Sequence, residues 1–150
     1  MNSKTIEEQN IKLNVTAEDW KDAVRQSGQL LVSSNYITED YINLTIKVVE
    51  ELGPYIVIAP GLALSHARPD VSVLKTGLSL LTLTKPINFN SENDPVDIVL
   101  TLAAKDDTDH LSMLQQISCY LSEDGMMDHI RNCTDVKELA EEINNYEVEF

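Results

Sequence analysis

The spacing of apolar residues changes twice along the chain, and these changes restrict the possible folds more than any single motif does. Up to residue 52, apolar side chains recur mainly at the three- and four-residue spacing of amphipathic helices. Between residues 55 and 103 they form short runs rich in Ile, Val, Leu and Thr, separated by Pro, Gly, Asn and Asp. From Thr108 the helical spacing returns. This order predicts helices before and after a central sheet buried on both faces, which is a layered α/β fold.

Turn and cap residues give the expected boundaries of these elements. Strands are expected at 11–15, 55–59, 62–64, 78–83 and 96–103. Helices are expected to begin at a cap formed by Thr16 and Asp19, at Thr38, at Asp107 or Thr108, near Met126 and at about Asp135. Gly53 and Pro54 are expected to end the second helix. No repeat or linker divides the sequence, so we expect one domain over residues 1–150, with its core at about 11–145.

The distribution of charge limits the possible partners. The net charge is −14: residues 1–52 carry 5 basic and 9 acidic side chains, residues 53–105 carry 4 and 4, and residues 106–150 carry 2 and 12. A protein that neutralises phosphates needs a basic face, so we expect no nucleic-acid partner and no anionic membrane surface. A basic partner would be attracted most strongly by the last third of the chain.

The cysteines and the apolar runs indicate the compartment. Cys119 and Cys133 have no metal-ligand spacing, and the first ten residues lack the apolar stretch of a signal peptide. No apolar run approaches the roughly 20 residues that a membrane span needs. We therefore expect a reduced, cytoplasmic protein that does not insert into a membrane.

His66 is the first candidate for chemistry. It follows the strand-like run 62–64, and the segment Ala67-Arg68-Pro69 breaks the strand directly after it. Such a histidine lies at the rim of a sheet, where α/β proteins place ligand sites. A neutral imidazole has a nitrogen lone pair that can act as base, metal ligand or nucleophile. From the residues alone, a surface or cap histidine is the open alternative.

His110 is the second candidate, because we expect it in the first turn of a helix. Unpaired backbone N–H groups and the positive end of the helix dipole favour an anion there, such as a phosphoryl group. The alternatives are an ordinary helix-start histidine or a metal site with the aspartates of residues 106–109, although these lack the spacing of a calcium loop. His129 is expected to be structural or solvated.

Arg68 could bind a phosphoryl group through the fork geometry of its guanidinium, with a solvated loop arginine as the alternative. No GxGxxG, GxxxxGK[ST] or GxSxG motif is present, so neither a nucleotide cradle nor a hydrolase elbow is predicted. Ser65 and His66 do not by themselves form a catalytic triad, because neighbours on a strand point to opposite faces.

Three segments together resemble the enzyme IIA domain of the mannitol/fructose type in the bacterial sugar phosphotransferase system: GPYIVIAPGLALSHARP, LSLLTLTKPINF and DPVDIVLTLAAKDDTDHLSMLQQIS. Within that group the chain is most similar to the ascorbate and galactitol-like branch. The resemblance extends from about Trp20 to Ile143. It implies a mixed sheet of about five strands with helices on both faces.

The resemblance also implies the activity of a phosphoryl carrier, a phosphotransferase component. The family takes a phosphoryl group from the phosphohistidine of HPr onto its own histidine and passes it to a cysteine of enzyme IIB. The acceptor matches His66, in the A-x-x-H loop of the family, and the assisting histidine matches His110. No cofactor and no metal are required.

Two positions depart from the pattern of the family. Ser65 stands where many relatives have proline directly before the acceptor. Glu50 and Glu51 occupy the neighbourhood where mannitol-type members carry a phosphoryl-binding arginine, so Arg68 is our candidate replacement. We further expect Leu62, Leu64 and Leu111 to form an apolar rim that docks a partner.

Other functions remain open at this point. A regulatory IIA-like protein would use its phosphorylation state to control a binding partner, and a metal-dependent enzyme would use the two histidines with the aspartates. The sugar is not specified by the sequence, because a IIA component hands its phosphoryl group to a protein. Ascorbate or a related sugar or polyol follows from the likeness to one branch only.

Overall fold

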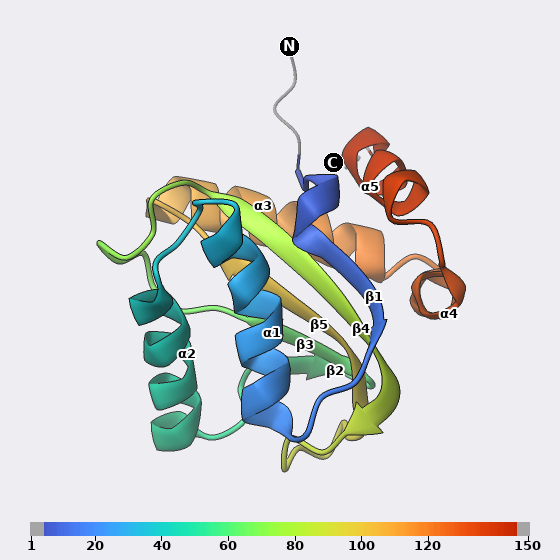
Figure 1. Ribbon diagram of the computed structural model, residues 1–150, viewed down its shortest axis with the longest axis horizontal. Helices are drawn as coiled ribbons and strands as arrows, with labels where there is room; N and C mark the ends of the chain where they lie inside the picture. The colour runs from blue at the N-terminus through green and yellow to red at the C-terminus, as the bar shows by residue number, and fades with distance from the viewer. Residues whose placement is uncertain (1–4, 147–150) are drawn as a thin grey trace.

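A five-stranded sheet lies between two layers of helices in the computed structural model, which describes residues 5–146 (Figure 1). The strands are β1 (Ile11–Val15), β2 (Val57–Ala59), β3 (Leu62–Ser65), β4 (Gly77–Ile87) and β5 (Val96–Ala103). A short 3-10 helix, η1 (Glu8–Asn10), precedes the α-helices α1 (Trp20–Ser33), α2 (Glu39–Leu52), α3 (Asp107–Leu121), α4 (Met126–Asn132) and α5 (Val136–Asn145). The ends of the predicted domain, residues 1–4 and 147–150, lie outside the described residues.

The sheet is mixed, with the strand order β1-β4-β5-β3-β2. β1 runs parallel to β4, and β3 runs parallel to β5. β4 and β5 are antiparallel, as are β2 and β3. The predicted α/β class with a mixed sheet of about five strands is therefore confirmed.

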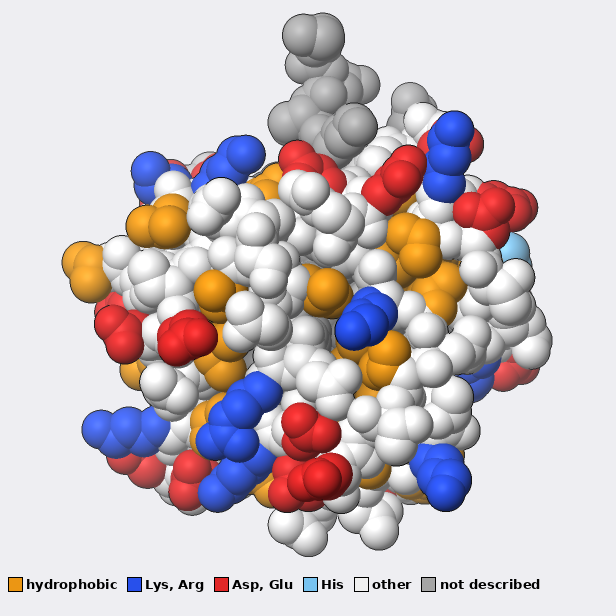
Figure 2. Space-filling model, viewed as in Figure 1, with side chains coloured by type: hydrophobic (Ala, Val, Ile, Leu, Met, Phe, Trp, Pro, Cys, Tyr) orange, Lys and Arg blue, Asp and Glu red, His pale blue; other side chains and the backbone are white. Residues whose placement is uncertain are grey.

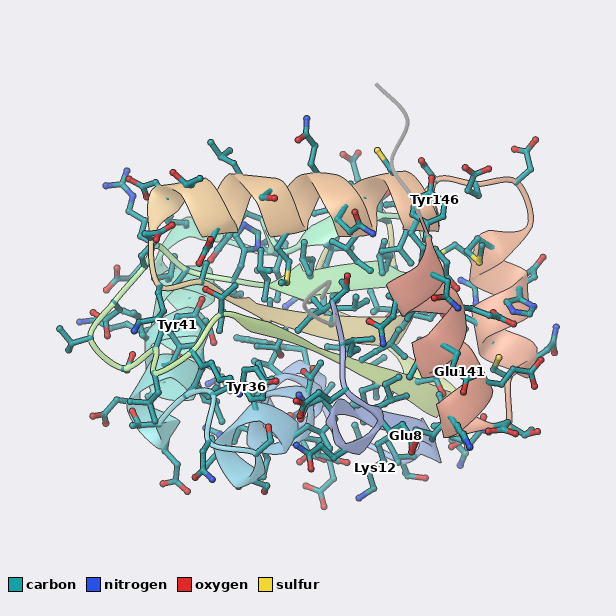
Figure 3. All side chains as sticks on the ribbon, turned by 90° about the horizontal axis from the view of Figure 1, so that it is seen from above. Glu8, Lys12, Tyr36, Tyr41, Glu141 and Tyr146 are labelled. Carbon is teal, nitrogen blue, oxygen red and sulfur yellow. The ribbon has the colours of Figure 1, made fainter. Side chains whose placement is uncertain are left out.

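Helices cover both faces of the sheet. α1 and α2 pack on one face, and α3, α4 and α5 pack on the other. Figure 3 shows the sheet between α3 and the α1–α2 layer. Alternate residues of the central strands divide between the two cores: Leu81 and Val99 belong to the α1–α2 side, whereas Leu80 and Leu100 belong to the α3–α5 side. This two-sided burial explains why the strand segments are continuous apolar runs rather than alternating ones.

Two of the predicted helix starts are displaced. α1 begins at Trp20 with Asp19 as its N-cap, so Thr16 lies outside the cap. α3 begins at Asp107, and its N-cap is Asp106, whose carboxylate accepts the backbone N–H of Asp109. In an N-cap, a side-chain oxygen accepts the backbone N–H of the residue three positions later, and each aspartate of this run could supply such an oxygen. α2 ends as predicted, with Gly53 as its C-cap at φ of 90°.

The strand boundaries also differ, by one residue at the end of β3 and the start of β4 and by more at two other places. β2 begins at Val57, because Tyr55 and Ile56 form the turn that follows α2. β4 continues to Ile87, beyond the predicted end at residue 83. Cys119 and Cys133 are free thiols. Among residues 5–146, no helix combines the length and apolar character needed to cross a bilayer.

Candidate functional site

The topology brings His66 and His110 to the same edge of the sheet. β3 and β5 are parallel neighbours in register, with Ser65 beside Thr101, so their carboxyl ends lie together. His66 directly follows β3, and His110 lies in the first turn of α3, which follows β5. The two imidazole centroids are 5.8 Å apart, with their planes inclined by 57°. Two candidates that are 44 positions apart in the sequence are thus side by side in the structure.

One hydrogen bond sets the tautomer of His66. Its Nδ1 lies 2.7 Å from the carbonyl oxygen of Leu64. A carbonyl oxygen can only accept, so Nδ1 carries the proton and donates it. In the neutral ring this leaves the lone pair on Nε2, which has no hydrogen-bond partner among residues 5–146. The nucleophilic atom of the ring is therefore Nε2.

The surroundings keep His66 neutral. Partial burial lowers the pKa of the imidazole below its usual value of 6.5, because desolvation disfavours the charged ring. The hydrogen bond to the carbonyl of Leu64 opposes this effect, and the charge of a protonated His110 would add to it. A neutral ring is the form with a free lone pair for nucleophilic attack.

Two tyrosines hold the chain around His66. The hydroxyl of Tyr55 donates to the main-chain carbonyl of His66, and the Tyr55 ring meets the imidazole edge to face, with centroids 5.3 Å apart and an angle of 80°. The hydroxyl of Tyr41 accepts the N–H of Ala67 at 3.0 Å and donates to the carbonyl of Leu102 in β5 at 2.9 Å. Tyr41 belongs to the first turn of α2 (labelled in Figure 3), and its hydroxyl reaches the sheet at β5.

The sequence analysis singled out neither tyrosine. Tyr55 and His66 are equidistant in sequence from the turn at Pro60 and Gly61, but the register of β2 and β3 shifts between Val57 and Ala59, so this symmetry does not by itself pair them. For Tyr41 the sequence holds no signal either, since its contacts depend on how α2 packs against the sheet.

A pocket of about 580 Å³ opens beside the two histidines. Its walls are of two kinds: Tyr55, His66, Arg68, Asp70 and His110 supply polar atoms, and α2 supplies an apolar wall. The carboxylate of Asp70 accepts hydrogen bonds from the N–H and the hydroxyl of Ser72. The wall residues are Leu44, Val48 and Leu52. The pocket can thus hold an anion against imidazole and guanidinium groups while an apolar surface lies beside it.

Arg68 is exposed and lines this pocket. Among residues 5–146 it makes no hydrogen bond or ion pair, so its guanidinium is not neutralised by a carboxylate in the described part of the chain. The structure therefore places all three candidate residues, His66, His110 and Arg68, around one pocket.

The aspartates at the start of α3 are engaged with the fold. Asp106 caps the helix, and the carboxylate of Asp109 accepts the hydroxyl of Thr76 at 2.8 Å. Within residues 5–146, no group of three or more His, Cys, Asp or Glu side chains is placed to hold a metal ion. The N-terminal turn of α3 thus offers fewer free N–H groups beside His110 than an uncapped helix would, because the Asp106 carboxylate already binds one of them.

The predicted apolar rim is largely wrong. Leu62 is 3% exposed and Leu64 is 0% exposed, because β3 lies between β5 and β2 with helices over it, whereas Leu111 is 66% exposed. The apolar surface at the pocket comes instead from α2. His129 takes no part in the pocket, and it pairs with Glu142 at 2.6 Å.

Comparison with known proteins decides the family. Residues 4–146 match the family described as "Phosphoenolpyruvate-dependent sugar phosphotransferase system, EIIA 2". The chain belongs to this EIIA family. It is thus an EIIA component of sugar transport and a phosphoryl-transfer protein, as the resemblance predicted.

Named relatives of this EIIA chain support the same placement. It is 39% identical over 146 residues to the ascorbate-specific PTS system EIIA component of Shigella flexneri, covering 96% of this chain and 95% of that protein. The solution structure of the mannitol-specific cryptic phosphotransferase enzyme IIA CmtB from Escherichia coli has a TM-score of 0.85 at 32% identity, covering 95% of this chain and 97% of that one.

A third similar structure is the complex of enzyme IIAMTL and phosphorylated enzyme IIBMTL from Escherichia coli. It matches this EIIA chain with a TM-score of 0.77 at 24% identity, covering 90% of this chain and 94% of that one. At this identity the likeness concerns the fold. The predicted likeness to the ascorbate branch is confirmed by the curated relatives rather than by this structure.

Proposed function

We propose that this EIIA chain accepts a phosphoryl group from phosphorylated HPr on Nε2 of His66 and passes it to a cysteine of enzyme IIB, for uptake of ascorbate or a related sugar or polyol. The observation that carries the proposal is the hydrogen bond from Nδ1 of His66 to Leu64. It leaves the lone pair on Nε2 in a ring that lines the pocket shared with His110 and Arg68.

The transfer balances without a cofactor. The Nε2 lone pair of His66 attacks the phosphorus, a new N–P bond forms, and the N–P bond to the HPr histidine breaks with its electron pair returning to that ring. Positive charge develops on the His66 imidazole, and the carbonyl of Leu64 stabilises it through the Nδ1–H. In the second step the cysteine thiolate of enzyme IIB attacks the same phosphorus, the S–P bond forms, and Nε2 regains its lone pair.

His110 and Arg68 would stabilise the phosphoryl group rather than form bonds to phosphorus. The transition state of phosphoryl transfer spreads negative charge over three equatorial oxygens, so nearby donors and cations lower its free energy. The ring of His110 is 5.8 Å from that of His66, close enough for an N–H to reach an oxygen of a group bound there. Arg68 lines the same pocket with a guanidinium that no described carboxylate neutralises.

The proposed partners have different kinds of support. Enzyme IIB is supported by the IIAMTL–IIBMTL complex, whose IIA subunit shares this fold. Ascorbate is supported by the names of relatives at about 40% identity. HPr as donor, and the separate steps on His66, follow from the sequence resemblance and from the free Nε2.

Phosphotransfer with purified components tests the proposal. Enzyme I, HPr and labelled phosphoenolpyruvate should add one acid-labile phosphate to the wild-type chain and none to His66→Ala. His110→Ala should fold and take up phosphate slowly, and His129→Ala is the matched control, expected at the wild-type rate because His129 lies outside the pocket. Uptake by His66→Ala at the wild-type rate would contradict the assignment.

A chase with enzyme IIB separates transport from regulation. Label that leaves His66 for a IIB cysteine supports a transport role. Label that no IIB protein accepts would favour the regulatory alternative. The genes beside this one offer a second test, because neighbours encoding IIB and membrane IIC components go with transport.

A further inference from the structure

We propose that Tyr55 is a positioning residue for the phosphoacceptor, acting through His66 rather than on the phosphoryl group. The inference rests on the proposed function, and it assigns a role to a side chain that no motif marked. Tyr55 contacts His66 twice, once at the main chain through its hydroxyl and once at the imidazole through its ring.

The β2–β3 hairpin builds this contact. Val57 pairs with Ala63 and Ala59 pairs with Leu62, so the residues outside these pairs converge at the open end of the hairpin. The N–H of Leu64 also donates to the carbonyl of Ile56 at 2.7 Å, and this hydrogen bond holds the two arms of the hairpin together up to the residues beside the site. Tyr55 precedes β2 by two positions and His66 directly follows β3, so the hairpin itself sets their separation.

Three contacts then restrict His66. Its Nδ1 is bound to the carbonyl of Leu64, its own carbonyl is bound to the hydroxyl of Tyr55, and the next N–H, of Ala67, is bound to Tyr41. With the main chain fixed on both sides, the ring can move only by side-chain rotation, and the contact with the Tyr55 ring opposes that rotation. In-line transfer requires the attacking nitrogen to be held in a near-attack geometry, which is what these contacts supply.

The hydroxyl of Tyr55 stays a donor under working conditions. Burial raises the pKa of Tyr55 above its usual value of 10.0, so the O–H is intact at neutral pH.

Tyr55→Phe is the deciding variant, because it removes the hydroxyl and keeps the ring. Tyr120→Phe is the matched control: Tyr120 is buried on the α3–α5 side, and its hydroxyl has no hydrogen-bond partner among residues 5–146. Nitrogen-15 NMR of the unphosphorylated proteins reports the tautomer of His66, and phosphotransfer from HPr gives the maximal rate and KM. Thermal unfolding checks that each variant is folded.

In Tyr55→Phe the released His66 main chain should weaken the hydrogen bond from Nδ1 to the carbonyl of Leu64, so we expect the two tautomers of His66 to mix. The maximal rate should fall on the order of 10- to 100-fold, the loss that a small misplacement of a reacting group produces. KM for HPr should stay unchanged, and Tyr120→Phe should behave as wild type in both assays. Tyr55→Leu, which also removes the ring, should lower the maximal rate at least as much as Tyr55→Phe does.

Two results would overturn the proposal. One is a Tyr55→Phe protein with the wild-type tautomer and the wild-type rate. The other is a slow Tyr55→Phe protein with an unchanged tautomer, since Tyr55 would then act directly on the phosphoryl group or on a partner. A wild-type chain that takes up no phosphate would refute the proposed function instead, and the NMR result would still decide whether Tyr55 positions His66.

Discussion

Replacing Tyr41 with phenylalanine should destabilise the fold by about 1–3 kcal/mol, the cost of leaving a buried hydrogen-bonding group unpaired. The Tyr41 hydroxyl connects two parts of the chain, accepting the N–H of Ala67 and donating to the carbonyl of Leu102. It therefore ties the residue that follows His66 to the central strand β5. The variant should lose stability and also slow phosphotransfer, because the His66 main chain is released on one side.

The magnitude follows from what phenylalanine keeps and what it removes. Tyr41 is 1% exposed, and its ring stays in the core, so little apolar burial is lost. The N–H of Ala67 has no other hydrogen-bond partner among residues 5–146, and water reaches it poorly, because Ala67 is also buried. Burial raises the pKa of Tyr41 to about 12, so the hydroxyl is protonated at any pH suitable for the assay.

Urea unfolding of three proteins measures the effect: wild type, Tyr41→Phe and Tyr120→Phe. Tyr120 is 2% exposed with an unpaired hydroxyl, so its replacement should not lower the free energy of unfolding, because a buried hydroxyl without a partner destabilises the folded state. If both variants lose the same free energy of unfolding, the bridge from Tyr41 to Ala67 and Leu102 does not hold the site together.

Three further predictions concern pH, Arg68 and salt. The pKa of folded His66 lies below the usual value of about 6.5 in an unfolded chain. The contribution of His66 to stability is therefore complete above about pH 6.5 and is lost as the pH falls through the folded pKa. An NMR titration of His66 with its midpoint above 6.5 would contradict this. The free energy of unfolding of Arg68→Ala should lie within about 0.5 kcal/mol of the wild-type value, while its phosphate transfer should be slower and Arg68→Lys should recover part of the rate. An unchanged transfer rate in Arg68→Ala would show that this guanidinium does not act in the site. Figure 2 shows acidic and basic side chains interspersed on the face that carries α1 and α2, whereas residues 106–150 carry 12 acidic and 2 basic side chains, with Glu147 and Glu149 outside the described residues. Stopped-flow association with phosphorylated HPr should slow as ionic strength rises from about 0.05 to 0.5 M, and a rate that does not change with salt would leave the acidity as a solubility feature.

The fold class was predictable because burial imposes a local pattern. Strands covered on both faces must be apolar at nearly every position, and this separated residues 55–103 from the helical segments. The start of α3 was less predictable, because several aspartates in a row can each cap a helix and only the end of β5 decides between them. The same two-sided burial made the Leu62 and Leu64 rim wrong: residues of an inner strand are covered, even near a site.

The candidate site was predictable residue by residue but not as an assembly. His66 at a strand end and His110 at a helix start were each marked by local signals. Their proximity depends on β3 lying beside β5, and no local sequence pattern predicts the strand order. The contact of Tyr55 depends on the shifted register of the β2–β3 hairpin, and that of Tyr41 depends on the packing of α2. No local pattern marks either one.

The most direct test of the account is to locate the phosphoryl group at atomic level. Long-range proton–nitrogen NMR of the chain phosphorylated by HPr distinguishes the two nitrogens of each histidine ring. Because Nδ1 of His66 is occupied by the carbonyl of Leu64, the account predicts phosphorus on Nε2 of His66. Phosphorus on Nδ1 of His66, or on either nitrogen of His110, would contradict it.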